Sequence, residues 1–249
     1  MEIITAIILL IGGLFAGIQN AIIGGGSLIS IPLLITTGLP AHLAIGTNRF
    51  AMIFNTGTGA FEYHRKVNYK IKLALFLAIF ASIGSYLGAN IVLQIDEIIL
   101  KYIIGILMLI MGSLILYKKK LGLKERKIKL TKRNYILIAL LSFLLGIYGG
   151  FFGAGVSTMF TFMFVALMGM SFIKSAGITR FIVSILSIIA AIVFLINMKI
   201  DFLFGIILII SFVAGAKIGV KLAFKAGNVW VRRLFIFLIV ISSIKLLFF

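Results

Sequence analysis

The sequence contains no cysteine, only two prolines, and six acidic residues against 24 basic ones in 249 residues. The absence of cysteine excludes disulfides, thiol catalysis and thiolate metal sites. Charge of either sign is missing between Glu2 and Arg49, and from four further long stretches at residues 73–94, 102–117, 134–173 and 181–198. A helix of a soluble protein needs only one apolar stripe, so uncharged runs of this length exclude an ordinary soluble fold.

Hydrophobic residues make up 62% of the chain. About 20 apolar residues cross the roughly 30 Å hydrocarbon core of a bilayer. The sequence therefore predicts an all-α, multi-pass protein of the cytoplasmic membrane, surrounded by lipid. The net charge of +18 would suggest nucleic acid in a soluble protein. Here the basic residues lie in short loops, where membrane topology explains them, and no nucleic-acid partner is expected.

The apolar residues fall into ten predicted segments, at about residues 3–20, 27–38, 41–62, 72–94, 98–117, 134–150, 156–170, 172–196, 202–224 and 230–248. The first lacks a basic n-region and an A-x-A cleavage pattern, so we expect it to be the first helix of the mature protein. The second and seventh segments are short for full spans, and each follows a glycine cluster. They are predicted either to span or to form half-helices of re-entrant hairpins.

The chain is predicted to be a duplication. "GIQNAIIGGGS" at residues 17–27 aligns with "GIYGGFFGAGV" at residues 146–156. "GTNRF" at residues 46–50 aligns with "GITRF" at residues 177–181, in the same order along the chain. Each half then holds five segments.

A basic linker at residues 118–133 separates the first repeat, 1–117, from the second, 134–249. The linker is expected to be cytoplasmic because short loops rich in lysine and arginine stay inside. A second basic cluster occupies residues 225–233. A parallel repeat would place this cluster outside, whereas an inverted repeat places it inside and both termini outside. Inverted repeats are typical of secondary transporters.

Cysteine labelling tests this topology directly, because the natural chain has no cysteine. Single cysteines at Lys124 and Asn228 are expected to react with an impermeant maleimide only when the inner membrane face is exposed. Labelling at Asn228 from the outside of intact cells would contradict the inverted repeat.

Two glycine clusters interrupt the apolar segments at matching positions: Gly24, Gly25 and Gly26 before Ser27, and Gly149, Gly150, Gly153 and Gly155 before Val156. Glycine lets the backbone turn sharply or approach a ligand closely. Irregular backbone at membrane depth occurs only where it is buried in protein or lines a cavity. The helices that resume after each cluster would direct free N–H groups and a positive dipole end at that cavity, which suits an anion.

The alternative is that these glycines only permit close helix packing. We expect that role for the pairs Gly84-x-x-x-Gly88 and Gly215-x-x-x-Gly219.

Two arginines stand alone in apolar surroundings. No charged residue separates Glu2 from Arg49, which lies eight residues past Ala41, roughly 12 Å into the third segment and near the bilayer midplane. Arg180 lies equally deep in the eighth segment. An intramembrane arginine costs at least a few kcal/mol unless it faces a cavity or a partner. The nearest carboxylate in sequence, Glu62, is expected near the cytoplasmic rim.

An anionic substrate is the predicted partner of both arginines, because the planar guanidinium binds oxyanions bidentately. We expect the two side chains to converge from opposite halves on one central cavity. The alternative is that both extend to the membrane interface.

Small polar residues are predicted to complete the hydrogen-bonding shell of this cavity, or else to serve helix packing: Thr47, Asn48, Asn55 and Thr179. His42, near the outer start of the third segment, is a candidate proton carrier. Lys217 in the ninth segment is a candidate further cation of the cavity.

In "GGGSLISIPLLITTGLPAHLAIGTNRFAMIF", residues 24–54, and "GIYGGFFGAGVSTMF", residues 146–160, the chain resembles the TauE/SafE family of sulfite exporters, also called TSUP permeases. The resemblance covers nearly the whole chain. It implies movement of sulfur-containing oxyanions and organosulfonates across the cytoplasmic membrane. The family's "GTS"-like turn reads Gly46-Thr47-Asn48 here, with asparagine in place of serine, and Gly177-Ile178-Thr179 in the second half.

The predicted function is a secondary transporter, an exporter of small sulfur-containing oxyanions such as sulfite. The alternatives are a permease for another small anion such as a carboxylate, or a membrane scaffold. An enzyme is not expected, because the membrane segments hold no aspartate and no paired histidines. No G-x-x-x-x-G-K-[ST] motif is present, so protons or sodium are the candidate coupling ions rather than ATP. No cofactor or metal is expected.

Overall fold

A computed structural model describes residues 3–22, 24–67, 69–100, 102–103, 106 and 131–248, with side chains described as far as Lys225. The described residues form helices and no strands: α1 (Ile3–Ile22), α2 (Ser27–Thr36), α3 (Ala41–His64), α4 (Ile71–Leu93), α6 (Lys132–Phe151), α7 (Val156–Met168), α8 (Phe172–Ile196) and α9 (Phe202–Phe248). The all-α prediction is confirmed. Most of the predicted segment 98–117 and of the linker 118–133 lies outside the described residues.

One predicted boundary is wrong. The segments predicted at 202–224 and 230–248 belong to a single unbroken helix, α9. The prediction divided them where hydropathy falls at the basic residues. Lysine and arginine are good helix formers, so their charge can end a membrane span without ending the helix.

Five of the described helices are long and apolar enough to cross a membrane: α1, α4, α6, α8 and residues Phe202–Lys225 of α9. The helices α2 and α7 have 10 and 13 residues, which corresponds to only about 15 and 20 Å of the roughly 30 Å core. The expectation that these two segments are short is therefore confirmed. Helix α3 has 24 residues but carries many buried polar groups, and it lies inside the bundle.

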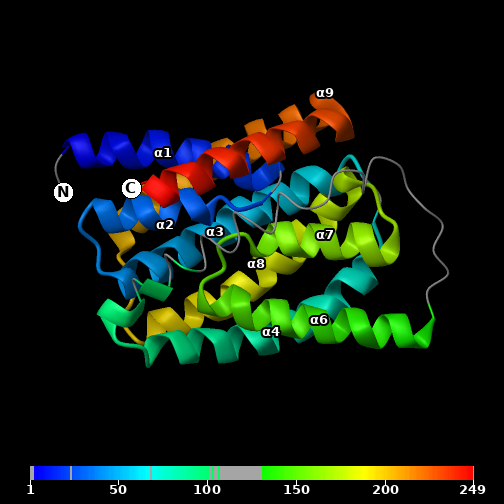
Figure 1. The fold of residues 1–249 in the computed structure, drawn as a ribbon, viewed down its shortest axis with the longest axis horizontal. Helices are drawn as coiled ribbons and strands as arrows, with labels where there is room; N and C mark the ends of the chain where they lie inside the picture. The colour runs from blue at the N-terminus through cyan, green and yellow to red at the C-terminus, as the bar shows by residue number, and fades with distance from the viewer. Residues whose placement is uncertain are drawn as a thin grey trace.

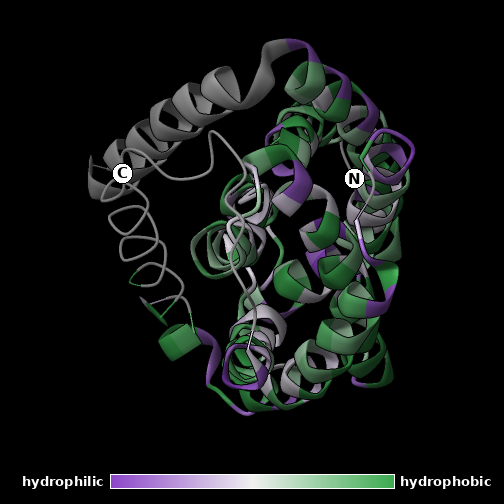
Figure 2. Ribbon diagram, turned by 90° about the vertical axis from the view of Figure 1, so that its right-hand side faces the viewer, coloured by the Kyte–Doolittle hydropathy of each residue, from purple (hydrophilic) through white to green (hydrophobic). Residues whose placement is uncertain are grey.

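The helices form layers around a central pair. Figure 1 shows α1 beside α9 along one edge and α4 beside α6 along the opposite edge, with α3 and α8 crossing between them. Large apolar residues are exposed on the outer faces of α1, α4, α6 and α9. Figure 2, turned by 90°, shows hydrophobic residues predominating around the outside of the described bundle. Such a surface suits lipid, and the chain is a multi-pass membrane protein.

Small residues bring the outer helix pairs into close contact, as the two glycine pairs predict. A side chain at Gly84 or Gly88 of α4 would overlap the backbone of α6. A side chain at Gly215 or Gly219 of α9 would press on the backbone of α1. Their role in close helix packing is confirmed.

The central helices α3 and α8 run antiparallel. Four contacts fix their register: Gly46 lies against Phe194, Gly57 against Ser184, Gly59 against Arg180, and Gly177 against Tyr63. As the residue number rises along α3, it falls along α8. This register determines where the two arginines stand relative to each other.

Candidate functional site

The two glycine breaks are real and have the same backbone character. Gly24 and Gly25 end α1 with φ of +98° and +81°, and Gly153 and Gly155 separate α6 from α7 with φ of +71° and +80°. Glycine adopts this left-handed region at no steric cost, which explains its presence at these four positions. Gly26 has helical dihedral angles instead, and a side chain there would overlap the backbone carbonyl of Ala16 in α1.

Arg49 of α3 is fully buried and lies at the break of the opposite half. Its guanidinium contacts Gly153 so closely that a side chain on that glycine would overlap it. Among the described residues, none forms a hydrogen bond with its Nε, Nη1 or Nη2 atom. Tyr148 on α6 lies near Arg49, and its phenol hydroxyl donates to the carbonyl of Ala154 at 2.6 Å.

Arg180 of α8 occupies the corresponding place at the first break. It is fully buried, and its Nη2 donates to the backbone carbonyl of Asn20, at the end of α1. Its Nε and Nη1 have no partner. A Cβ placed on Gly59 would lie 3.4 Å from the Cγ and Cδ atoms of Arg180. Tyr63 lies near the guanidinium, and its hydroxyl donates to the carbonyl of Ala21 at 3.0 Å.

The complete burial of both arginines contradicts the alternative that they extend to the interface. Each belongs to one half of the chain and lies at the break of the other half. In the register of α3 against α8, Arg180 faces Gly59, ten residues along α3 from Arg49. At 1.5 Å per residue the two Cα atoms are about 15 Å apart along the helix pair. The two arginines therefore lie at separate positions, and each has its own neighbours.

Three residues that sequence reasoning did not single out adjoin the arginines: Asn20, Tyr63 and Tyr148. Asn20 accepts from Arg180 through its carbonyl and from the Gly26 N–H through Oδ1 at 3.4 Å. Both Asn20 and Tyr148 lie inside the repeated glycine motif, which was the available signal. Nothing local in the sequence marks Tyr63, because its proximity to Arg180 depends on the packing of α3 against α8.

Two of the predicted shell residues, Asn48 and Thr179, form matching hydrogen bonds with the two short helices. Asn48 on α3 accepts from Ser30 of α2 at 2.5 Å and donates to Ser27 at 3.0 Å. Thr179 on α8 accepts from Thr161 of α7 at 3.3 Å. Both helix-to-helix pairs join residues that are 18 apart in sequence. These hydrogen bonds hold each short helix against the arginine-bearing helix of its own half. In both halves the bonded residue on the long helix directly precedes the arginine.

Thr47 and Asn55 make contacts elsewhere. The Thr47 hydroxyl accepts from the Asp201 N–H at 2.8 Å, in the turn before α9. Asn55 accepts from the Nδ2 of Asn20 at 2.6 Å and donates to the carbonyl of Phe212 in α9 at 2.9 Å. Both residues are buried, and their hydrogen bonds tie α3 to α1 and α9.

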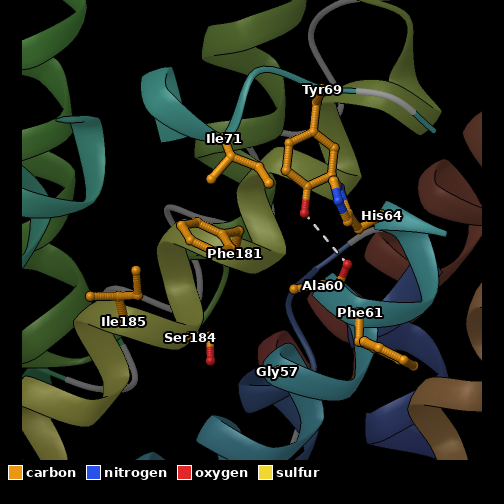
Figure 3. Close-up of a pocket in the computed structure, with 9 residues that line it drawn as sticks. All are labelled: Gly57, Ala60, Phe61, His64, Tyr69, Ile71, Phe181, Ser184 and Ile185. Carbon is orange, nitrogen blue, oxygen red and sulfur yellow. Dashed lines mark hydrogen bonds between the residues drawn. The ribbon is translucent and has the colours of Figure 1, made fainter. Parts of the chain in front are cut away.

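A cavity of about 330 Å³ opens between α3 and α8 on another face of α3 (Figure 3). It is lined by Gly57, Ala60, Phe61, His64, Tyr69, Ile71, Phe181, Ser184 and Ile185. The α3 residues in this lining recur at helical spacing on one face, whereas Gly59 and Tyr63, which adjoin Arg180, lie on another. The lining contains no arginine or lysine, so this cavity is not the anion site predicted from the sequence.

The candidate proton carrier His42 and the candidate cation Lys217 make their contacts away from the arginines. The His42 ring adjoins the Glu97 carboxylate, with 2.8 Å between Nδ1 and Oε2, and its Nε2 lies 3.0 Å from the Val92 carbonyl. Lys217 is exposed on α9, so the expectation that it lines the cavity is wrong. Sequence position alone did not show which face of α9 it occupies.

The carboxylate of Glu97 gives the protein a predicted acid sensitivity. Burial raises the pKa of Glu97, but hydrogen bonds from the Ala41 N–H and the His42 ring outweigh it and lower the pKa below its usual range. Because its pKa is lower in the folded state, the ionised Glu97 stabilises the fold at pH values above its unfolded-state pKa of about 4.3. This stabilisation is lost as the pH falls through the folded-state pKa. Glu97→Gln is expected to flatten the decrease in melting temperature below about pH 5.

Melting temperatures in detergent, measured from about pH 6 to pH 3 across that titration, check this prediction, with Glu62→Gln as the matched control. Equal acid sensitivity in wild type and Glu97→Gln would contradict it.

Comparison with known proteins now defines the family. The family profile described as "Sulfite exporter TauE/SafE" matches residues 9–246. The chain belongs to the TauE/SafE family. A "Probable membrane transporter protein" of Haemophilus influenzae is 30% identical to this TauE/SafE protein over 95% of this chain and 92% of the relative. The "Probable membrane transporter protein ORF9" of a Sinorhizobium species is 26% identical over 96% of this chain and 91% of the relative.

A plant protein matches a shorter part of the chain. "Sulfite exporter TauE/SafE family protein 3" of Arabidopsis thaliana is 32% identical over 32% of this chain and 17% of the plant protein. No solved structure matches the chain. The resemblance read from the glycine motifs is confirmed, and this TauE/SafE protein is a member of a membrane transporter family.

Proposed function

We propose that the protein is a secondary transporter that exports small sulfur-containing oxyanions or organosulfonates, such as sulfite, by alternating access, with Arg49 and Arg180 binding the anion. The observation that carries this proposal is the pair of fully buried guanidinium groups with unused donors. Both lie in a member of a transporter family.

Buried charge explains why an anion is the missing partner. Each unpaired arginine costs at least a few kcal/mol at membrane depth, and such residues mark substrate pathways. No described residue accepts a hydrogen bond from the five N–H groups of Arg49, and Arg180 donates from one nitrogen to a backbone carbonyl. Two oxygens of a sulfite or sulfonate group would accept two hydrogen bonds from one guanidinium, in the bidentate geometry that guanidinium favours.

The packing of the helices supports alternating access between two related halves. Helix α1 packs on α9, and in the same way α6 packs on α4. Helix α3 also packs on α9, and α8 packs on α4. The central helices α3 and α8 pack on each other. These pairings match a two-fold relation between the halves, and the antiparallel run of α3 against α8 supports an inverted repeat, in which one half could move against the other. Because each arginine contacts the break of the opposite half, such a movement would change both arginine environments together.

Flux into liposomes tests the proposal. Purified protein is reconstituted in vesicles, and uptake of labelled sulfite is measured against sulfate, thiosulfate, ethanesulfonate and acetate, with imposed proton or sodium gradients. We expect saturable sulfite or sulfonate flux that exceeds protein-free vesicles. Acetate flux alone would favour the carboxylate permease, and the absence of all flux would favour a scaffold.

A further inference from the structure

We infer that the protein holds two anion sites rather than one, each built from both halves of the chain; this inference rests on the proposed function. The first, the Arg49 site, comprises Arg49, Tyr148, Gly153 and the first turn of α7. The second, the Arg180 site, comprises Arg180, Tyr63, Asn20 and the first turn of α2. Each takes one small oxyanion.

Each site has its own unused donors. Within the part of the chain that the structure describes, all three nitrogens of Arg49, and the Nε and Nη1 of Arg180, are buried without a hydrogen-bond partner. Arg49 lies against Gly153, two residues before Gly155 caps the start of α7. Asn20 links Arg180 to α2, because it accepts from Arg180 and from the Gly26 N–H that precedes this helix. A helix start and a buried guanidinium therefore adjoin at both places, and both attract an anion.

The helix register keeps the two sites apart. The Cα atoms of Arg49 and Arg180 are about 15 Å apart along α3 and α8. Side chains on a helix tilt toward its own N-terminus, and in this antiparallel pair the two N-termini lie at opposite ends. The guanidinium groups therefore diverge. Charged hydrogen bonds need donor–acceptor distances of about 2.7–2.9 Å, so one small oxyanion cannot contact both groups.

The sites differ in their available donors. Arg49 has its whole guanidinium free, whereas Arg180 already donates to the Asn20 carbonyl. An anion at the Arg180 site must share this arginine with a backbone oxygen. We therefore expect the Arg49 site to bind the anion more tightly than the Arg180 site.

Binding stoichiometry decides between two sites and one. Equilibrium dialysis of radiolabelled sulfite under argon, on protein in lipid nanodiscs, is expected to give two ions bound per wild-type chain. Arg49→Gln and Arg180→Gln should each bind one, with weaker binding in Arg49→Gln, and the double variant none. Arg49→Lys and Arg180→Lys should keep two sites of lower affinity, which separates loss of a site from loss of folding. One ion per wild-type chain, abolished by either Gln variant, would overturn the inference.

Crosslinking tests the geometry without any anion. The cysteine-free chain allows the pairs Arg49→Cys with Ala154→Cys and Arg180→Cys with Ala21→Cys to be compared with Arg49→Cys and Arg180→Cys together. A short membrane-permeant bis-methanethiosulfonate is expected to join the first two pairs and not the third. Efficient crosslinking of the third pair alone would overturn two separate sites. If wild type bound no sulfite, the proposed substrate class would fail, and this crosslinking pattern would still decide the arrangement of the arginines.

Discussion

Replacing Arg49 with glutamine is expected to weaken anion binding at its site by about 2–5 kcal/mol, or roughly 30-fold to several thousand-fold, because a buried anion would lose its charged partner. Arg180→Gln should have a comparable effect at the other site. Arg→Lys keeps the charge but loses the planar fork, so it should weaken binding less than Arg→Gln while still reducing transport. The measurements are sulfite affinity by dialysis and initial flux in liposomes.

A matched control is available in Lys217, a membrane-helix cation that is exposed on α9. Lys217→Gln removes one positive charge without touching either arginine, so it should leave affinity and flux near wild type. If Lys217→Gln reduced flux as strongly as Arg49→Gln, a general loss of positive charge would explain the effect. If both arginine variants kept wild-type affinity while remaining folded, the arginines would have a purely structural role.

Much of the fold could be predicted because membrane helices are encoded by local composition. The start of α3 at Ala41 and of α8 at Phe172 agrees with the sequence prediction, since each follows a turn with a proline, glycine or serine. The interruptions before Ser27 and Val156 were predictable for the same reason, because glycine at positive φ is a local backbone property. The unbroken α9 was not predictable from hydropathy, which reports where a span ends and not where a helix ends.

The site was predictable in its residues but not in its arrangement. Arg49 and Arg180 stand out in sequence because each is a lone charge in an apolar helix. Their separation depends on the register of α3 against α8, which is a tertiary property that no single motif encodes. The same limit applies to Thr47 and Asn55, whose neighbours in sequence suggested the anion shell. Their hydrogen bonds go to the turn before α9, to α1 and to α9 itself.

The repeated motif also shows why Asn20 and Tyr148 were overlooked. The glycines of the two aligned segments indicate the backbone breaks, whereas the polar residues just before the breaks lie beside the arginines. In a membrane interior, a carboxamide or phenol beside a glycine break is itself informative, because its polar group must find a partner there. Asn20 accepts a hydrogen bond from a backbone N–H of its break, and Tyr148 donates one to a backbone carbonyl of the other break.

Gly153→Ala is expected to abolish transport and to lower stability, through two separable causes. The methyl group would overlap the Arg49 guanidinium and displace it from the break. The φ of +71° also costs a non-glycine residue about 1–2 kcal/mol. Gly38→Ala isolates the second cause, because Gly38 has a φ of +101° and nothing within 4 Å of an added Cβ. Both variants should show a lower melting temperature, but only Gly153→Ala should lose sulfite flux and high-affinity binding. Equal loss of flux in the two variants would assign the effect to backbone strain and remove the support that Gly153 gives to the Arg49 site.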